Sequence, residues 1–193
     1  MYLFGCGIEK YRNESDIQKI FLLIKPFLKH GTIILTSNFQ NLNALISPSG
    51  IKHSSFCYIE EDIYYVIELS NTSQLKKQNI NEFLKKRDSL FLFDYYNSSI
   101  MNKTMNYILD YENVEYGFFG KSEYCYKLIF NVYRDVYKNE YNIIYKNMSE
   151  FFPVINFFGL EYVNSNSILK SKKFIPTCCV MNNIFLKFKN SSK

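Results

Sequence analysis

The stretch IKHSSFCYIEEDIYYVIEL, which spans residues 51–69, decides the fold. Residues 51–59 and 63–69 are rich in β-branched and aromatic side chains, and the three acidic residues 60–62 form a short polar break between them. Strand-forming runs separated by so short a polar segment are typical of a β-hairpin. The sequence therefore predicts two adjacent antiparallel strands here.

The register of this hairpin decides which side chains face each other. A two-residue turn at 60–61 pairs Ile59 with Asp62. Counting back from that pair places His53 opposite Glu68, whereas a three-residue turn would shift the pairing by one. A carboxylate within an apolar strand is costly to bury without a partner. An imidazole opposite it would be oriented and stabilised in its charged form, as in a catalytic triad.

The rest of the chain carries further helical and strand-like patterns. Apolar residues recur at helical spacing in 13–29, from Ser98 or Ser99 to Leu109, and in 122–137, and these segments are predicted to be helices. Short apolar runs predict strands at 32–36 and 90–93, and a helical turn is predicted within 39–46. Residues 71–87 are predicted to be a polar loop, and the segment after Glu150 an irregular tail that ends in the apolar run 184–188.

Composition limits the classes of protein to which the chain can belong. The 193 residues are 47% hydrophobic and 21% charged, which excludes a disordered tail and suffices for a core. A net charge of +5 is too small to indicate a nucleic-acid reader. Two histidines and the absence of a Cys-x-x-Cys pair argue against a zinc hydrolase. No secretory leader and no membrane-spanning run is recognised, so free thiols in a reducing cytoplasm are expected.

One of the five cysteines stands out by its position. Cys125 follows the glycine-containing loop Tyr116–Gly120 and falls in the first turn of the helix predicted from Ser122. Unpaired N–H groups and the helix dipole at such a place favour a thiolate, and the same N–H groups can stabilise an oxyanion. A structural thiol is the alternative, because free cysteines commonly pack as small hydrophobes.

The two candidate partners of this thiol also have ordinary explanations. His53 fits a half-exposed strand position, and Glu68 fits a solvent-exposed carboxylate on an edge strand. His30 follows the end of a predicted helix, where a cation is favourable, and no chemistry is assigned to it.

The order of these features along the chain resembles one superfamily. The features are GTIILT (31–36), KHS (52–54) and VIE (66–68) on successive strands, followed by YGF (116–118) and then by YCYKLI (124–129) on a helix. In this order they resemble the circularly permuted papain-like thiol hydrolases related to NlpC. Within that superfamily the chain is most similar to the poxvirus branch. The histidine precedes the cysteine, which is the permuted order.

The resemblance implies a fold and a set of roles. The fold is expected to be α+β, with the helix that carries Cys125 packed on an antiparallel sheet that carries His53 and Glu68. Cys125 corresponds to the nucleophile, His53 to the general base and Glu68 to the residue that orients it. Tyr116 corresponds to a residue on the substrate and oxyanion side. No metal and no other cofactor is expected.

The similarity also suggests how the chain is divided. A single domain is expected over residues 1–193. Its catalytic core would span about residues 25–140, with the helix 13–29 at its start and a C-terminal extension after about residue 150.

Two functions follow from the resemblance. The first is a cysteine-dependent hydrolase or acyltransferase that attacks an amide or ester bond, in a lipid acyl group or a peptide, through an acyl-thioester. The poxvirus branch extends this to a viral protein in the host cytoplasm that acts on host substrates. The second is a catalytically inactive member of the same fold that binds a host protein or a membrane. Contact with a membrane surface would suit a lipid substrate, and no nucleic-acid partner is expected.

Overall fold

The computed structural model describes residues 11–38, 53–69, 75–108, 125–136, 146–147, 161–162, 168, 173–181 and 183–188. Their helices are α1 (Glu14–Ile24), the 3₁₀ turn η1 (Lys25–Phe27), α2 (Ile80–Lys85), α3 (Ser98–Ile108) and α4 (Cys125–Val136). Their strands are β1 (Ile33–Asn38), β2 (His53–Glu60), β3 (Ile63–Leu69), β4 (Leu75–Asn79), β5 (Arg87–Tyr95), β6 (Lys146–Asn147), β7 (Glu161–Tyr162), β8 (Phe174–Met181) and β9 (Ile184–Lys187).

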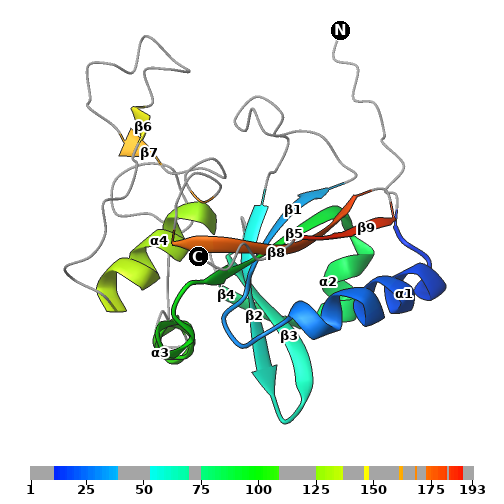
Figure 1. The fold of residues 1–193 in the computed structure, drawn as a ribbon, viewed down its shortest axis with the longest axis horizontal. Helices are drawn as coiled ribbons and strands as arrows, with labels where there is room; N and C mark the ends of the chain where they lie inside the picture. Colours follow the sequence, from blue (N-terminus) through cyan, green and yellow to red (C-terminus); the bar gives the residue numbers. More distant parts are fainter. Residues whose placement is uncertain are drawn as a thin grey trace, which may run out of the picture.

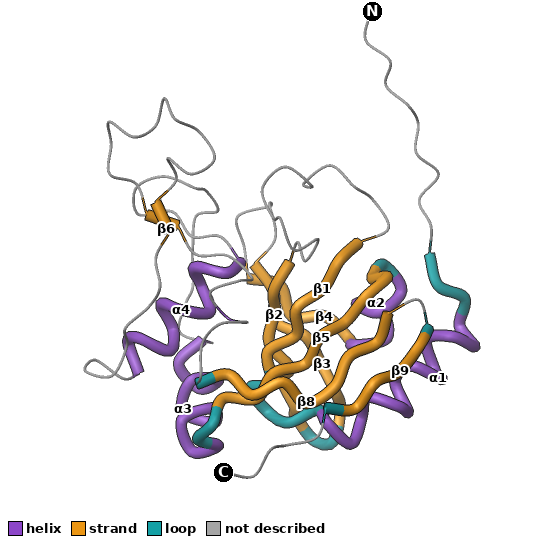
Figure 2. Tube along the Cα trace, turned by 45° about the horizontal axis from the view of Figure 1, so that its top comes forward, coloured by secondary structure: helices purple, strands orange, loops and turns teal. Residues whose placement is uncertain are grey.

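A seven-stranded sheet with helices on both faces organises the molecule (Figure 1). Its strand order is β4-β3-β2-β1-β5-β8-β9, and every neighbouring pair is antiparallel. Helices α3 and α4 lie on one side of the sheet and α1 and α2 on the other, as the tube view also shows (Figure 2). This mixture of helices with an antiparallel sheet confirms the predicted α+β class.

Two hydrophobic clusters lie on the two faces of the sheet. Because successive strand residues point to opposite faces, Phe56 belongs to the cluster under α3 and α4, and Cys57 to the cluster under α1 and α2. In β3, Ile67 and Val66 divide between the clusters in the same way. Glu68 therefore shares the face of Val66, toward α1 and α2, which decides the surroundings of its carboxylate.

Local sequence explains where the first elements begin. Asn13 caps α1 by accepting a hydrogen bond of 2.8 Å from the Asp16 amide, and the buried face of the helix carries three isoleucines. Gly31, which precedes β1, has a φ of +94°, and a Cβ atom there would lie 3.0 Å from the carbonyl oxygen of Met101. Glycine is required at this position both by its backbone conformation and by the close approach of α3.

Several predicted elements are confirmed. The two hairpin strands are present as β2 and β3. The strands predicted at 32–36 and 90–93 lie within β1 and β5, and the helix predicted from Ser98 or Ser99 is α3. The predicted helix 13–29 is divided into α1 and η1, and the described part of the predicted helix 122–137 is α4. The helical turn predicted within 39–46 lies outside the described residues.

Three predictions are wrong. The hairpin turn lies at Glu61–Asp62, whose φ angles of 49° and 62° are left-handed as in type I′ turns, and Glu60 pairs with Ile63. Residues 71–87 are not simply a loop, because β4 and α2 lie within them. The tail after Glu150 is not irregular throughout, because β8 pairs with β5 and β9 extends the same sheet.

The described helices are all short by the measure of a lipid bilayer. None of them is both long and apolar enough to span a membrane.

Candidate active site

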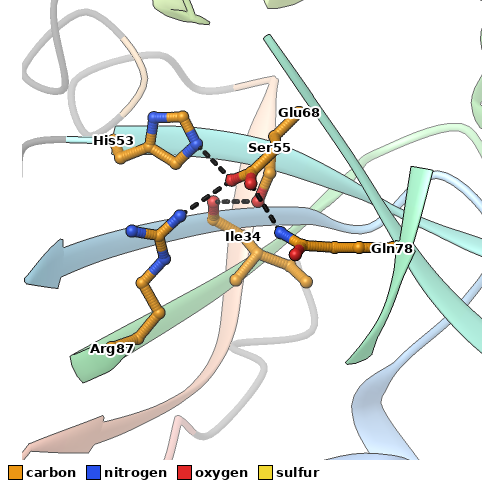
Figure 3. Close-up of polar contacts among 6 residues, drawn as sticks. All are labelled: Ile34, His53, Ser55, Glu68, Gln78 and Arg87. Carbon is orange, nitrogen blue, oxygen red and sulfur yellow. Dashed lines mark hydrogen bonds and ion pairs between the residues drawn. The ribbon is translucent and has the colours of Figure 1, made fainter. Parts of the chain in front are cut away.

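His53 and Glu68 meet at one end of the β2–β3 hairpin (Figure 3). His53 is the first residue of β2, and its Nε2 lies 2.7 Å from Oε2 of Glu68. The pairing of Phe56 with Ile67, continued by one residue, places Ser55 and not His53 directly opposite Glu68. The predicted register is therefore wrong by two residues. Because a shift of two residues is even, His53 and Glu68 still lie on the same face of the sheet. Their side chains are long enough to meet diagonally across the two strands.

The Glu68 carboxylate is the centre of a buried polar network. Only 6% of the residue is exposed, and it accepts hydrogen bonds from three side chains. Nη2 of Arg87 lies 2.8 Å from the same Oε2 that contacts His53, and Nε2 of Gln78 lies 2.5 Å from Oε1. Burial raises the pKa of Glu68, but the hydrogen bonds and charges of His53 and Arg87 outweigh it and lower the pKa to about 2. Glu68 is therefore a carboxylate at neutral pH.

The Cys125 thiol completes the contacts of the imidazole. It is the first residue of α4, it is buried, and it hydrogen-bonds to the His53 side chain and to the Ser54 backbone. Burial raises the pKa of this thiol, but the hydrogen bond and charge of His53 outweigh burial and lower the pKa below its ordinary value. The same ring contacts Glu68 through its Nε2, so one imidazole lies in contact with both groups.

The imidazole itself is held in its charged form. Burial lowers the pKa of His53, but the hydrogen bonds with Cys125 and Glu68 reverse this and raise the pKa to about 9. The lowered pKa of the thiol and the raised pKa of the imidazole both favour the thiolate–imidazolium pair over the neutral pair. Such a pair is the reactive state of cysteine nucleophiles that are activated by a neighbouring histidine.

The other described cysteines show that burial alone does not produce this state. Cys57, Cys178 and Cys179 are free thiols and buried, as Cys125 is. Burial raises the pKa of Cys57 and of Cys178 to about 12, and it raises the pKa of Cys179 as well. Of the four cysteines that the structure describes, Cys125 is thus the one whose environment favours the thiolate.

The structure brings together three of the four predicted site residues and adds two that were not predicted. Cys125, His53 and Glu68 are in contact, whereas Tyr116 lies outside the described residues. Arg87 and Gln78 were missed because each stands in a polar run, KKR or KKQN, that is typical of a solvated surface. The strand pattern alone carries no signal for either of them.

Within the part of the chain that the structure describes, no three His, Cys, Asp or Glu side chains are grouped so that they could hold a metal ion.

Comparison with known proteins shows which proteins this chain is similar to. The search of curated proteins gives no match. Among solved structures, the chain is similar to the metalloprotein YiiX from Escherichia coli O157:H7, with a TM-score of 0.63 and 14% sequence identity. The similarity covers 78% of this chain and 96% of that one. At this identity the likeness shows a shared fold.

A family model extends the comparison from fold to family. Residues 27–175 match the model of the permuted papain-like amidase enzymes, YaeF/YiiX, C92 family. The matched region begins in η1 and ends in β8, so it contains the histidine, the carboxylate and the thiol described above. The chain belongs to this family of papain-like cysteine amidases.

Proposed function

We propose that the protein is a cysteine-dependent hydrolase or acyltransferase in which Cys125 is the nucleophile. His53 is its general base and acid, and Glu68 orients the imidazole. The observation that carries this proposal is the His53 ring in contact with the Glu68 carboxylate and the buried Cys125 thiol at once. The family assignment supports the same class of chemistry, because it describes a permuted papain-like amidase.

The first half of the reaction uses the preformed ion pair. The thiolate of Cys125 attacks the carbonyl carbon of an amide or ester, and the carbonyl oxygen takes up the negative charge. Backbone N–H groups at the start of α4 are suited to stabilise that oxyanion, with the Tyr116 hydroxyl as a further predicted donor. As the intermediate collapses, the imidazolium of His53 gives its proton to the departing amine or alcohol, and an acyl-thioester remains on the sulfur.

The second half releases the acyl group. The now neutral His53 accepts a proton from water, and the resulting hydroxide attacks the thioester carbonyl and expels the thiolate. An alcohol or amine in place of water would make the same step an acyl transfer. In both cases the imidazolium is restored, and Glu68 stabilises its positive charge throughout the cycle.

The substrate class is proposed from the sequence resemblance. Similarity to the poxvirus branch points to a viral protein that acts in a host cytoplasm. The amide or ester bond of a lipid acyl group is the substrate we favour there, with a peptide amide as the alternative. A lipid substrate would require contact with a membrane surface.

Alkylation tests the activated thiol without knowledge of the substrate. Iodoacetamide at pH 7, followed by peptide mapping, is expected to modify Cys125 well before Cys178, because the pKa of the Cys125 thiol is lowered and that of the Cys178 thiol is raised. A panel of fatty-acyl and peptidyl esters and amides then identifies the substrate class. Cys125→Ala should abolish turnover, whereas Cys178→Ala should retain it.

The inactive binding module is the outcome that would oppose this proposal. Equal labelling of Cys125 and Cys178 would show that the thiol is not activated. A stably folded Cys125→Ala protein that kept its full biological effect would show that the fold serves binding and not catalysis.

A further inference from the structure

Arg87 and His53 share a single oxygen atom. Nη2 of Arg87 lies 2.8 Å from Oε2 of Glu68, and Nε2 of His53 lies 2.7 Å from that same atom. Figure 3 shows the carboxylate between the two cationic side chains. Little of any of the three is accessible, with side-chain exposures of 10% for Arg87, 16% for His53 and 7% for Glu68. A charge-assisted hydrogen bond in such a setting fixes the carboxylate as well as its ionisation.

The guanidinium is itself held in place. Its central carbon lies 4.6 Å from the centre of the Phe83 ring of α2, and the Arg87 carbonyl accepts a hydrogen bond of 2.7 Å from Nε of Arg12. Arg12 also donates to the Asp88 carbonyl at 2.5 Å and, through its amide, to the Lys85 carbonyl at 3.0 Å. The residues just before α1 therefore secure the start of β5, and with it the position of Arg87.

Gln78 secures the other oxygen of the carboxylate. Its Nε2 lies 2.5 Å from Oε1 of Glu68, and it carries no charge. With both oxygens engaged, the Glu68 carboxylate has little freedom to rotate away from His53. Arg87 therefore differs from Gln78 in the charge that it adds and not in the presence of a hydrogen bond.

Four charged groups in contact form a sequence of alternating sign. In the ion-pair state of the proposed function they are the Cys125 thiolate, the His53 imidazolium, the Glu68 carboxylate and the Arg87 guanidinium. Their formal charges cancel, whereas removal of the guanidinium would leave one negative charge in excess in a buried site. Asp88 also attracts the guanidinium, from the same strand.

The positive charge of Arg87 acts on the pKa of each neighbouring group in the same direction. A nearby cation favours the deprotonated form of any titrating group. Accordingly, the charge of Arg87 lowers the pKa of Glu68 and of His53, and it attracts the thiolate of Cys125. Loss of that charge should move the ionisation of the thiol to higher pH.

We propose that Arg87 is a positioning residue: it holds Glu68 oriented toward His53, and its charge sets the pH above which Cys125 is a thiolate. This inference rests on the proposed function, in which that thiolate is the nucleophile. It assigns to the start of β5 a part in the active site.

The test is the pH dependence of Cys125 alkylation by iodoacetamide, measured by peptide mapping between pH 4 and pH 10. In Arg87→Met, the midpoint of thiolate formation is expected to rise by about one pH unit, so alkylation below the midpoint slows about tenfold. Arg87→Lys keeps the charge and should retain a midpoint close to that of the wild type. Lys77→Met is the matched control, because it removes an equal charge whose partner is Glu60, at 2.6 Å on the surface.

Folding is monitored in every variant by circular dichroism and thermal melting. If Arg87→Met does not fold, Arg87→Gln is the second neutral variant, since it keeps a donor beside Glu68. A folded neutral variant with the wild-type midpoint would overturn the inference. A Lys variant that shifts as far as the Met variant would overturn the role of the charge. Equal labelling of Cys125 and Cys178 in the wild type would instead contradict the proposed function itself. That result is distinguishable from a failure of the inference on Arg87, which appears only in the variants.

Discussion

Replacement of Glu68 by Gln should remove a defined and pH-dependent part of the stability of the fold. The pKa of Glu68 is lowered from its ordinary 4.5 to about 2, although burial by itself raises it, because His53 and Arg87 stabilise the carboxylate. A group whose pKa is lower in the folded state adds stability that is fully present above its unfolded pKa and is lost as the pH falls through the folded pKa. A fall from 4.5 to about 2 corresponds to about 3 kcal/mol in the free energy of unfolding.

The measurement is urea unfolding of wild-type and Glu68→Gln proteins between pH 6 and pH 3, followed by circular dichroism. At pH 6 the variant should be less stable by about 3 kcal/mol, and at pH 3 the difference should shrink to about 1 kcal/mol as the wild-type carboxylate approaches its folded pKa. Glu60→Gln is the matched control, because Glu60 belongs to the same hairpin but pairs with Lys77 at the surface, with 47% of its side chain exposed. An exposed pair contributes little, so this variant should follow the wild type.

One result would refute this reasoning. If the stability difference between wild type and Glu68→Gln stays constant from pH 6 to pH 3, Glu68 does not titrate as an ion held between His53 and Arg87. The polar network would then have to be bound by neutral hydrogen bonds, and the thiolate–imidazolium pair would lose the anion that supports it.

Three further predictions concern other parts of the molecule. His53→Ala should return the pKa of Cys125 to its ordinary value or above and slow its iodoacetamide labelling at pH 7 by at least about tenfold, with thermal melting as the fold control. Gly31→Ala should lower the free energy of unfolding by about 2 kcal/mol, because the φ of Gly31 is +94° and a Cβ atom there would lie 3.0 Å from a main-chain oxygen of α3. Urea titration measures this loss, and an unchanged unfolding midpoint would contradict the prediction. Asp94→Ala should cost about 2 kcal/mol, because this buried carboxylate accepts a threonine hydroxyl at 2.8 Å and Nζ of Lys29 at 2.5 Å, whereas Lys29→Met should cost less because 62% of the lysine side chain is exposed.

The sequence was sufficient to predict the meeting of His53 and Glu68, although by a wrong register. The alternation of side chains in two short apolar strands places both residues on one face of the sheet. An error of two residues in the pairing preserves that face, whereas an error of one would have separated them. The turn itself was misplaced because Glu61 and Asp62 adopt left-handed backbone angles without the glycine or asparagine that usually announces them.

Two strands away from the centre of the sheet, β4 and β8, were not predictable. The polar run of β4 buries little, so its sequence LKKQN carries no alternating pattern. β8 contains Pro176, which counts against a strand, and it pairs with β5, which lies about 80 to 90 residues earlier in the chain. Such pairings depend on the assembled sheet and not on local preference.

Arg87 was hidden for a related reason. β5 is separated from β3 in the sheet by β2 and β1, so no pairing rule brings Arg87 to Glu68. Their contact exists because a long side chain reaches across the end of the sheet. The resemblance to a family could supply the three residues that react, but it could not supply this neighbour.

The division of the candidate site between the two faces of the sheet has a consequence for how the protein matures. The sulfur is part of the cluster beneath α3 and α4, while the acidic group lies on the opposite face with Val66, near the phenylalanine of α2 against which Arg87 packs. A nascent polypeptide that has formed the β2–β3 hairpin but has not yet docked α4 holds an ordinary thiol, because the hairpin brings His53 and Glu68 together without the sulfur. The thiol therefore gains its activating contacts only when α4 docks on the sheet, whereas the hairpin alone pairs the imidazole with its carboxylate.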